Sequence, residues 1–227
     1  MTEPAASSPQ ADHPPTHIGP RLRDRRKALG ISLRELARRI GVSASLVSQI
    51  ERDKVNPSVS TLYALARELG LNMGDLFDPQ GSTHGGDRWR SRGAPPPIVV
   101  PEDRSVINLA SGVTWERLTP ERDPAVEFLQ VTYHVGSESC PADSLVTHGG
   151  REYAYVISGR LGVRIDFDEY CVEPGCSITF DASSPHRLWA IGDEPVVAIW
   201  VVVGRQRDSR VPAEELIPER GRSQEGL

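Results

Sequence analysis

The sequence predicts a two-domain α + β chain, in which a linker joins an N-terminal all-α bundle to a C-terminal all-β barrel. Between residues 33 and 69, apolar residues recur at the helical spacing i, i+3, i+4, i+7. From residue 98 to 203, short apolar runs alternate with Gly and Pro turns, as in a β-sandwich or barrel. The stretch between them holds four glycines and three consecutive prolines, a composition typical of linkers. We therefore expect a tail (1–16), the helical domain (17–77), a linker (78–97), the β domain (98–204) and a second tail (205–227).

Charge is divided unevenly between the two predicted domains. The whole chain carries a formal net charge of −5. From His17 to Gly70 there are eleven Lys or Arg against five Asp or Glu, a balance of +6. From Gly93 to Leu227 there are twelve against twenty-one, a balance of −9. A basic small domain beside an acidic larger one is expected of a nucleic-acid reader attached to a part that does not touch nucleic acid.

Cysteine usage and hydropathy indicate the compartment. Three cysteines without C-x-x-C spacing argue against a disulfide framework and for a reducing environment. The longest apolar run, Val196 to Val203, is far shorter than the roughly 20 residues that span a bilayer. Residues 1–15 lack the apolar core of a signal peptide, and both tails have the composition of disordered segments. We expect a cytoplasmic protein with no membrane contact.

Two short helices separated by a tight turn form the centre of the helical domain. The first begins after Ser32, which makes a capping-box signature with Glu35, and ends at Gly41. The second begins after Ser43 and turns its apolar residues inward. Its opposite face carries short hydrogen-bonding side chains and one cation: Ser45, Ser48, Gln49 and Arg52. Such a face suits the major groove of DNA, where polar side chains read base edges and cations hold phosphates.

Three further helical segments complete the bundle. We expect a helix at 21–29, a helix capped by Ser60 and closed by Gly70, and a last turn at 73–77.

Residues 20–77 resemble the helix-turn-helix domain of the phage-repressor and XRE-type regulators. The resemblance depends on four segments: Leu33-Arg-Glu-Leu-Ala37, Gly41-Val-Ser43, Ser45-Leu-Val-Ser-Gln-Ile-Glu-Arg52 and Asn56-Pro-Ser-Val-Ser-Thr-Leu62. The resemblance implies double-stranded operator DNA as a partner. The residues implied to lie nearest the bases are Ala44, Ser45 and Gln49, with Ser48 on the same face. The residues implied to contact phosphates are Ser32, Ser43, Arg52, Lys54 and Asn56.

The same resemblance pairs Arg26 with Glu51 as a buried ion pair beneath the second helix. Such a pair is structural, since removing one partner costs several kcal/mol. The alternative for this segment is an ordinary helical bundle with a solvated polar face. The agreement of caps, turn and spacing favours the DNA reader.

Nine apolar runs predict the strands of the β domain: 98–100, 105–109, 113–118, 126–135, 152–157, 161–167, 177–180, 187–191 and 196–203. Two turn signals, Ser158-Gly-Arg160 and Glu173-Pro-Gly175, predict hairpins between neighbouring strands.

Two segments of this domain resemble the motifs of the cupin superfamily, a small double-stranded β-barrel. The first is His148-Gly-Gly-Arg-Glu152 followed by Gly159, and the second runs from Pro174-Gly175 to Pro185-His186. The resemblance covers roughly residues 98–204. It implies a ligand pocket inside the barrel, where His148, Glu152 and His186 converge. Two imidazoles and one carboxylate suit a divalent transition metal such as Fe, Mn, Ni or Zn.

The chain departs from the metal-binding cupins at two positions. Val146 stands where they carry a further histidine, and Ala190 stands where the second motif commonly has asparagine. Three interpretations of the cluster stay open. It is a three-ligand metal site with open positions, a metal-free polar cluster that orients a small molecule, or a core cluster whose members only satisfy one another.

We expect a sequence-specific DNA-binding transcriptional regulator, not an enzyme, whose cupin domain senses a small-molecule effector. A homodimer is expected because one short recognition helix reads only a few base pairs. The alternative from another class is a mononuclear non-haem iron oxygenase of the hydroxypropylphosphonate epoxidase type, which resembles this chain in joining a helix-turn-helix-like domain to an iron cupin. The caps, polar face and flanking cations of the DNA-reading helix favour the regulator.

Overall fold

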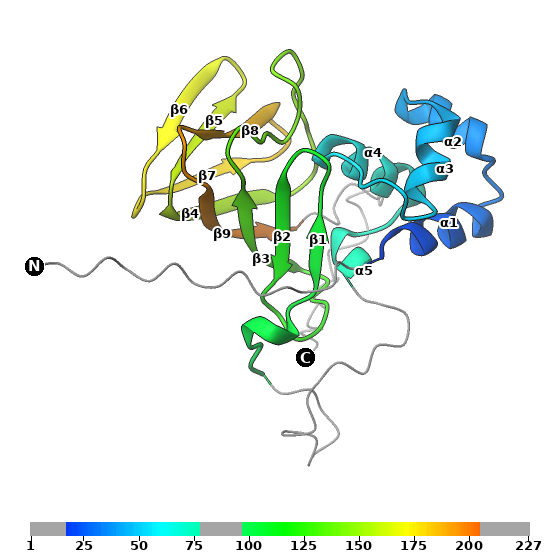
Figure 1. The fold of residues 1–227 in the computed structure, drawn as a ribbon, viewed down its shortest axis with the longest axis horizontal. Helices are drawn as coiled ribbons and strands as arrows, with labels where there is room; N and C mark the ends of the chain where they lie inside the picture. Colours follow the sequence, from blue (N-terminus) through cyan, green and yellow to red (C-terminus); the bar gives the residue numbers. More distant parts are fainter. Residues whose placement is uncertain (1–16, 78–96, 205–227) are drawn as a thin grey trace, which may run out of the picture.

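The computed structural model describes residues 17–77 and 97–204 (Figure 1). The first range is helical and the second consists of strands and loops, which confirms the predicted α + β fold class. The predicted tails, 1–16 and 205–227, and nearly all of the predicted linker, 78–97, lie outside the described residues. The domain boundaries stay a prediction.

The helical part contains α1 Gly19–Ala28, α2 Leu33–Ile40, α3 Ala44–Ile50, α4 Val59–Leu69 and α5 Met73–Phe77. Local sequence explains where they start and stop. Side chains of Ser32, Ser43 and Ser58 cap α2, α3 and α4 by accepting a backbone N–H three residues on. Gly41 and Gly70 end α2 and α4 in the left-handed conformation, with φ of 71° and 60°. The predicted cap Ser60 is wrong, because the hydroxyl of Ser58 binds the Thr61 N–H at 3.2 Å and Ser60 already lies within the helix.

The helices meet in one apolar core. Each contributes residues from its helical stripe, and Leu22, Leu36, Val47 and Leu62 are 0% exposed. Burying such side chains is the main stabilisation of short helices, which are marginal alone. The core therefore fixes how α3 is presented to solvent.

Among the helices at 19–77, none has the length and apolar character that a membrane-spanning helix needs.

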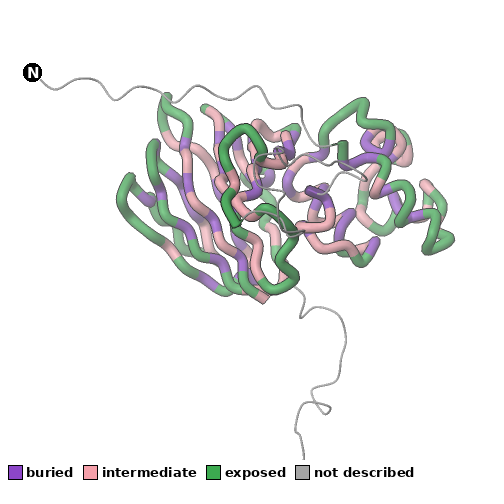
Figure 2. The backbone as a smooth tube through the Cα atoms, turned by 90° about the horizontal axis from the view of Figure 1, so that it is seen from below, coloured by how far each residue is buried: buried purple, intermediate pink, exposed green. Residues whose placement is uncertain are grey.

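The β part is built from two antiparallel sheets. The six-stranded sheet has the order β1 Val106–Asn108, β2 Val113–Arg117, β3 Val126–Tyr133, β9 Val196–Val203, β4 Arg151–Ser158 and β7 Ser177–Asp181. The three-stranded sheet has the order β6 Asp168–Val172, β5 Arg160–Ile165 and β8 His186–Ile191. Burial alternates along β4 and β9 (Figure 2), so one face of the large sheet points into the barrel and the other points outward.

The set of predicted strands needs two corrections. Residues 98–100 form no strand and lead into a short 3-10 helix, Pro101–Asp103. Strand β6 was not predicted, because four of its five residues are exposed and the apolar alternation that marks half-buried strands is absent.

The two predicted hairpins are wrong as well. Ser158-Gly-Arg160 leads from β4 in the large sheet to β5 in the small one, and Glu173-Pro-Gly175 leads from β6 back to β7. Both turns are corners between sheets. A Cβ at Gly159 would lie 2.4 Å from the carbonyl oxygen of Pro195, so the first corner needs glycine. The hairpin instead joins β5 to β6 through Asp166, whose φ is 53°.

The helical part rests on the barrel through α4, α5 and the loop before α4 (Figure 1). The N–H of Ala110 donates a hydrogen bond to the carbonyl of Pro57 at 2.9 Å. Arg122 and Asp75 form an ion pair at 2.6 Å. Helix α3 therefore remains available on another side of the bundle.

Candidate functional site

Helix α3 presents the polar face that the sequence predicts for DNA reading. Val47 and Ile50 are buried, which turns the opposite side toward solvent. On that side Gln49 Nε2 donates a hydrogen bond to Ser45 Oγ at 3.4 Å, and Arg52 Nε donates to the carbonyl of Ser48 at 3.0 Å. Of the predicted DNA-contacting residues, the structure leaves six exposed, Ser32, Ser43, Ser45, Arg52, Lys54 and Asn56, and three half-buried, Ala44, Ser48 and Gln49.

Glu35 lies beside this surface on α2. Ser32 Oγ accepts the Glu35 N–H at 3.1 Å, but the Glu35 carboxylate does not return a contact to complete the capping box. It accepts hydrogen bonds from Arg38 and Arg39 instead. These hydrogen bonds, with Arg38 the stronger, lower the pKa of Glu35 to about 2. Glu35 is therefore ionised at neutral pH and orients both arginines.

A buried ion pair supports α3 from beneath. Arg26 of α1 donates from Nε to Glu51 Oε1 at 2.6 Å and from Nη2 to Oε2 at 2.9 Å, and its Nη1 donates to the carbonyl of Ile31 at 2.8 Å. The two residues are 8% and 5% exposed. Hydrogen bonding to Glu51 raises the pKa of Arg26. Because Glu51 is the C-cap of α3, this bidentate pair fixes the end of α3 on α1.

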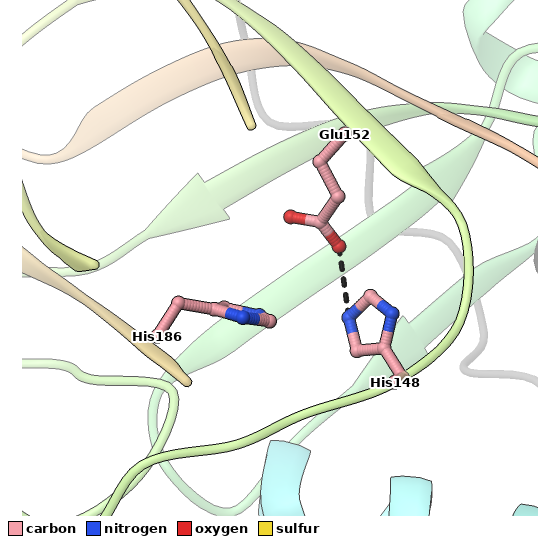
Figure 3. A group of neighbouring side chains, drawn as sticks. All are labelled: His148, Glu152 and His186. Carbon is pink, nitrogen blue, oxygen red and sulfur yellow. Dashed lines mark ion pairs between the residues drawn. The ribbon is translucent and has the colours of Figure 1, made fainter. Parts of the chain in front are cut away.

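The second candidate site lies inside the barrel and consists of His148, Glu152 and His186, here called the barrel site. His148 precedes β4, Glu152 points inward from β4, and His186 begins β8 in the other sheet. Figure 3 shows the three side chains directed toward one another. One ligand atom from each lies within 4.8 Å of the others. Glu152 and His186 are 2% and 1% exposed, so the site is screened from bulk water.

Hydrogen bonds to neighbouring groups orient the two imidazoles. Nδ1 of His148 lies 3.1 Å from the carbonyl of Gly149, and Nδ1 of His186 lies 2.9 Å from the carbonyl of Ser184. A carbonyl only accepts, so each Nδ1 carries a hydrogen and each ring turns its Nε2 into the site. Glu152 Oε2 accepts a hydrogen bond from Trp200 Nε1 at 3.1 Å. The neighbouring groups thus fix the ligand atoms.

The arrangement fits a bound cation. Nε2 of His148 lies 2.9 Å from Glu152 Oε1, but this buried nitrogen has no directed hydrogen bond. A lone pair facing a carboxylate oxygen at that distance is repulsive unless a proton or a metal ion stands between or beside them. Two imidazoles and one carboxylate would hold a divalent transition metal and leave coordination positions open.

The position of the replaced histidine is also defined. Val146 pairs with His186 through two backbone hydrogen bonds of 2.9 Å. Its apolar side chain supplies no ligand atom, so three residues of the described chain form this cluster.

Aromatic side chains surround the barrel site. The ring of Phe180 packs 5.0 Å from that of His186, and the ring of Tyr63 packs 4.8 Å from that of His148, measured between centroids. Tyr133 is 3% exposed. Burial chiefly, followed by the nearby Tyr63 and Glu152, raises the pKa of Tyr133 well above its usual value, so its hydroxyl keeps its proton.

Tyr63 and Tyr133 were missed by the sequence analysis as contributors to this site, and Trp200, whose place in core, interface or pocket the sequence left open, contributes as well. Trp200 sits at an inward position of β9, and Tyr133 sits at an inward position of β3. Strand alternation would have found both. Tyr63 gives no comparable signal, because its contact depends on how two domains pack.

Comparison with known proteins agrees with this arrangement. A helix-turn-helix family model matches residues 22–76, and a cupin domain model matches residues 129–202. The chain is 28% identical to the HTH-type transcriptional regulator PuuR of Escherichia coli over 75% of its own length and 85% of that protein. It is 37% identical to an uncharacterized transcriptional regulator in the ATPase CF(0) region of Rhodospirillum rubrum, over 38% of this chain and 88% of that one.

A solved structure extends the likeness to the fold. The crystal structure of an HTH_3 family transcriptional regulator from Vibrio cholerae superposes with a TM-score of 0.56 at 24% sequence identity. The match covers 83% of this chain and 96% of that one.

Proposed function

Because this chain belongs to the helix-turn-helix transcriptional regulators with a C-terminal cupin domain, we propose that it binds one operator sequence through α3 and senses a small effector through the barrel site. The observation that carries the proposal is the polar face of α3, supported by the buried pair of Arg26 and Glu51. A helix used only for assembly has no need of an uncharged hydrogen-bonding face flanked by cations.

The roles within the DNA surface differ by chemistry. Ala44, Ser45 and Gln49 lie at the start and on the polar face of α3, where side chains reach base edges. Arg52, Lys54 and Asn56 follow the helix and are exposed, as groups that hold phosphates must be. Gln49→Ala should therefore relax sequence preference, while Arg52→Ala should weaken binding to all duplexes and reduce the salt slope by about one.

The test is a binding titration with labelled DNA from immediately upstream of the coding region, against salt and against scrambled duplex. Tight binding that survives the scrambled competitor supports the regulator. Arg160→Ala, which removes an exposed cation from β5, is the matched control and should leave binding unchanged. Equal loss from Arg52→Ala and Arg160→Ala would refute the assignment of the surface.

The regulator acts as a homodimer in this proposal, because one recognition helix of seven residues reads few base pairs. A second copy has a suitable surface on the outward face of the large sheet. Phe128, Tyr153 and Tyr155 are 36%, 43% and 49% exposed there, and Phe128 and Tyr153 both pair with Val201 of β9. Sedimentation of the protein and of Tyr155→Arg tests this. A dimer that Tyr155→Arg dissociates supports the surface, and a monomer at micromolar concentration refutes it.

The barrel site binds rather than catalyses in this proposal. His148, Glu152 and His186 would hold a divalent metal, which would supply open coordination positions to an oxygen- or nitrogen-bearing effector. Glu152→Ala should abolish metal retention, so unchanged metal content in that variant would refute the metal site. Oxygen consumption by the iron-loaded protein that Glu152→Ala abolishes would favour an oxygenase.

A further inference from the structure

Helix α4 belongs to the DNA-binding bundle, yet one of its side chains lies against the barrel site. The buried residues of α4 face the bundle core, and Tyr63 lies outside that stripe and is half-buried. Its ring centroid is 4.8 Å from that of His148 and 5.7 Å from that of Trp115 on β2. Both partners belong to the β part. An aromatic residue of the DNA-binding domain thus directly contacts a member of the barrel site.

A second observation places Tyr63 near the same site. Tyr133 is buried on β3, and both Tyr63 and Glu152 act electrostatically on its hydroxyl. Tyr63 is therefore close to Tyr133 as well as to His148. In Figure 3 the cut ends of a pale cyan helix, the colour of α4 in Figure 1, lie at the lower edge of the view on the side of His148.

The contacts that flank Tyr63 connect α4 to the DNA surface. The carbonyl of Pro57, two residues before α4, accepts the hydrogen bond from Ala110 of the β part. Pro57 directly follows Asn56, which we assign to phosphate contact. The loop that carries Asn56 is therefore attached to the barrel through Pro57 and continues directly into α4.

We propose that α4 of the DNA-binding domain forms one wall of the barrel site, with Tyr63 packed over His148, and that an occupant held by His148 changes how α4 docks on the barrel. The inference rests on the proposed function for what the bundle then does to DNA. The effector class is a divalent metal ion or a small polar molecule that engages the imidazole of His148. Such an occupant interacts differently with the docked and shifted states of α4, which coupling between two sites requires.

Hydrogen exchange of the full chain tests whether α4 forms this wall of the barrel site. Exchange is measured by mass spectrometry on peptides that cover residues 59–69. His148→Ala removes the ring under Tyr63 and should speed exchange in α4 about two- to tenfold, the range for losing one aromatic contact. His148→Gln is the milder variant should the alanine variant fail to fold. His134→Ala, which removes a half-buried histidine on the loop after β3, is the control and should leave exchange in α4 unchanged.

The same measurement in a Tyr63→Leu background completes a double-mutant cycle. In the Tyr63→Leu background, His148→Ala should no longer change hydrogen exchange in α4. In the Tyr63→Phe background, which keeps the ring, His148→Ala should still speed that exchange. Saturating Ni²⁺ alone, used as the probe, should change exchange in α4 of the wild type at least twofold and have no effect in Tyr63→Leu. Unchanged exchange in α4 on His148→Ala, or an equal change with and without the Tyr63 ring, would overturn the inference.

These outcomes are independent of whether the protein is a regulator, because the exchange experiment contains no DNA. A positive cycle together with absent operator binding would retain the wall and reject the proposed function. Operator binding together with a negative cycle would retain the proposed function and reject α4 as a wall of the barrel site.

Discussion

Replacing Glu51 by alanine should unfold the DNA-binding domain at a much lower temperature. The substitution deletes both oxygens that hold Arg26, at 2.6 and 2.9 Å, and leaves a guanidinium that is 8% exposed with one remaining contact, to the carbonyl of Ile31. Breaking a buried pair in this way costs about 3–5 kcal/mol. The surviving contact with Ile31 places the expected cost near the lower limit, at about 3 kcal/mol. For a domain of this size that lowers the melting midpoint by about 12–24 °C.

The assay is thermal and urea unfolding followed by circular dichroism at 222 nm, since the α-helices of the described residues all lie between 19 and 77. Glu35→Ala is the matched control. It removes the same charge and more ion-pair contacts, but from a side chain that is 35% exposed against 5% for Glu51, so it should shift the midpoint little. Replacing Arg26 and Glu51 together by leucine should cost less than Glu51→Ala alone, because no charge is then left buried. The reasoning fails if Glu51→Ala and Glu35→Ala are equally mild, or if the double leucine variant costs as much stability as Glu51→Ala or more.

Three further predictions follow from single contacts. Ser43→Ala and Ser58→Ala each remove an N-cap and should each cost about 1 kcal/mol of stability. Only Ser43→Ala should also weaken operator binding, because Ser43 caps α3. Equal effects of the two variants on DNA affinity, measured by titration, would contradict this. Trp200→Phe deletes the indole N–H that orients Glu152 and should lower metal affinity about 10- to 100-fold by calorimetry, so unchanged affinity would show that this contact is dispensable. Burial raises the pKa of the Cys140 thiol, so Cys140 should react with a thiol reagent only after unfolding. In native protein at pH 8 the two exposed thiols, Cys171 and Cys176, should react. Three fast-reacting thiols in the native state would argue against this packing.

Features set by local chemistry were predictable from the sequence. The capping serines, the glycines that end helices and the i, i+3, i+4, i+7 stripes depend only on residues within one or two turns, and they placed α2 and α3 closely. The resemblance to the cupin motifs implied that His148, Glu152 and His186 converge, and in the structure one ligand atom of each lies within 4.8 Å of the others. Strand alternation directs Glu152 inward.

Features set by long-range packing were not predictable in the same way. Ser158-Gly-Arg160 has the composition of a hairpin turn, and only the pairing of β4 with β9 and of β5 with β8 shows that it is a corner between sheets. Strand β6 is held by its backbone pairing with β5, while four of its five residues are exposed and give no periodic signal. The position of Tyr63 depends on the complementarity of two separate domains, which neither domain's periodicity encodes.

The contact between Tyr63 and Trp115 also limits how modular this protein is. The helical and cupin parts are matched by separate family models, which invites the view that either can be excised or exchanged. Trp115 is 4% exposed with α4 in place, and a barrel produced without the helical part would uncover this side of the indole. A chimaera that takes the cupin from this chain should therefore keep the helical bundle with it, because α4 alone would expose the apolar residues that face the bundle core.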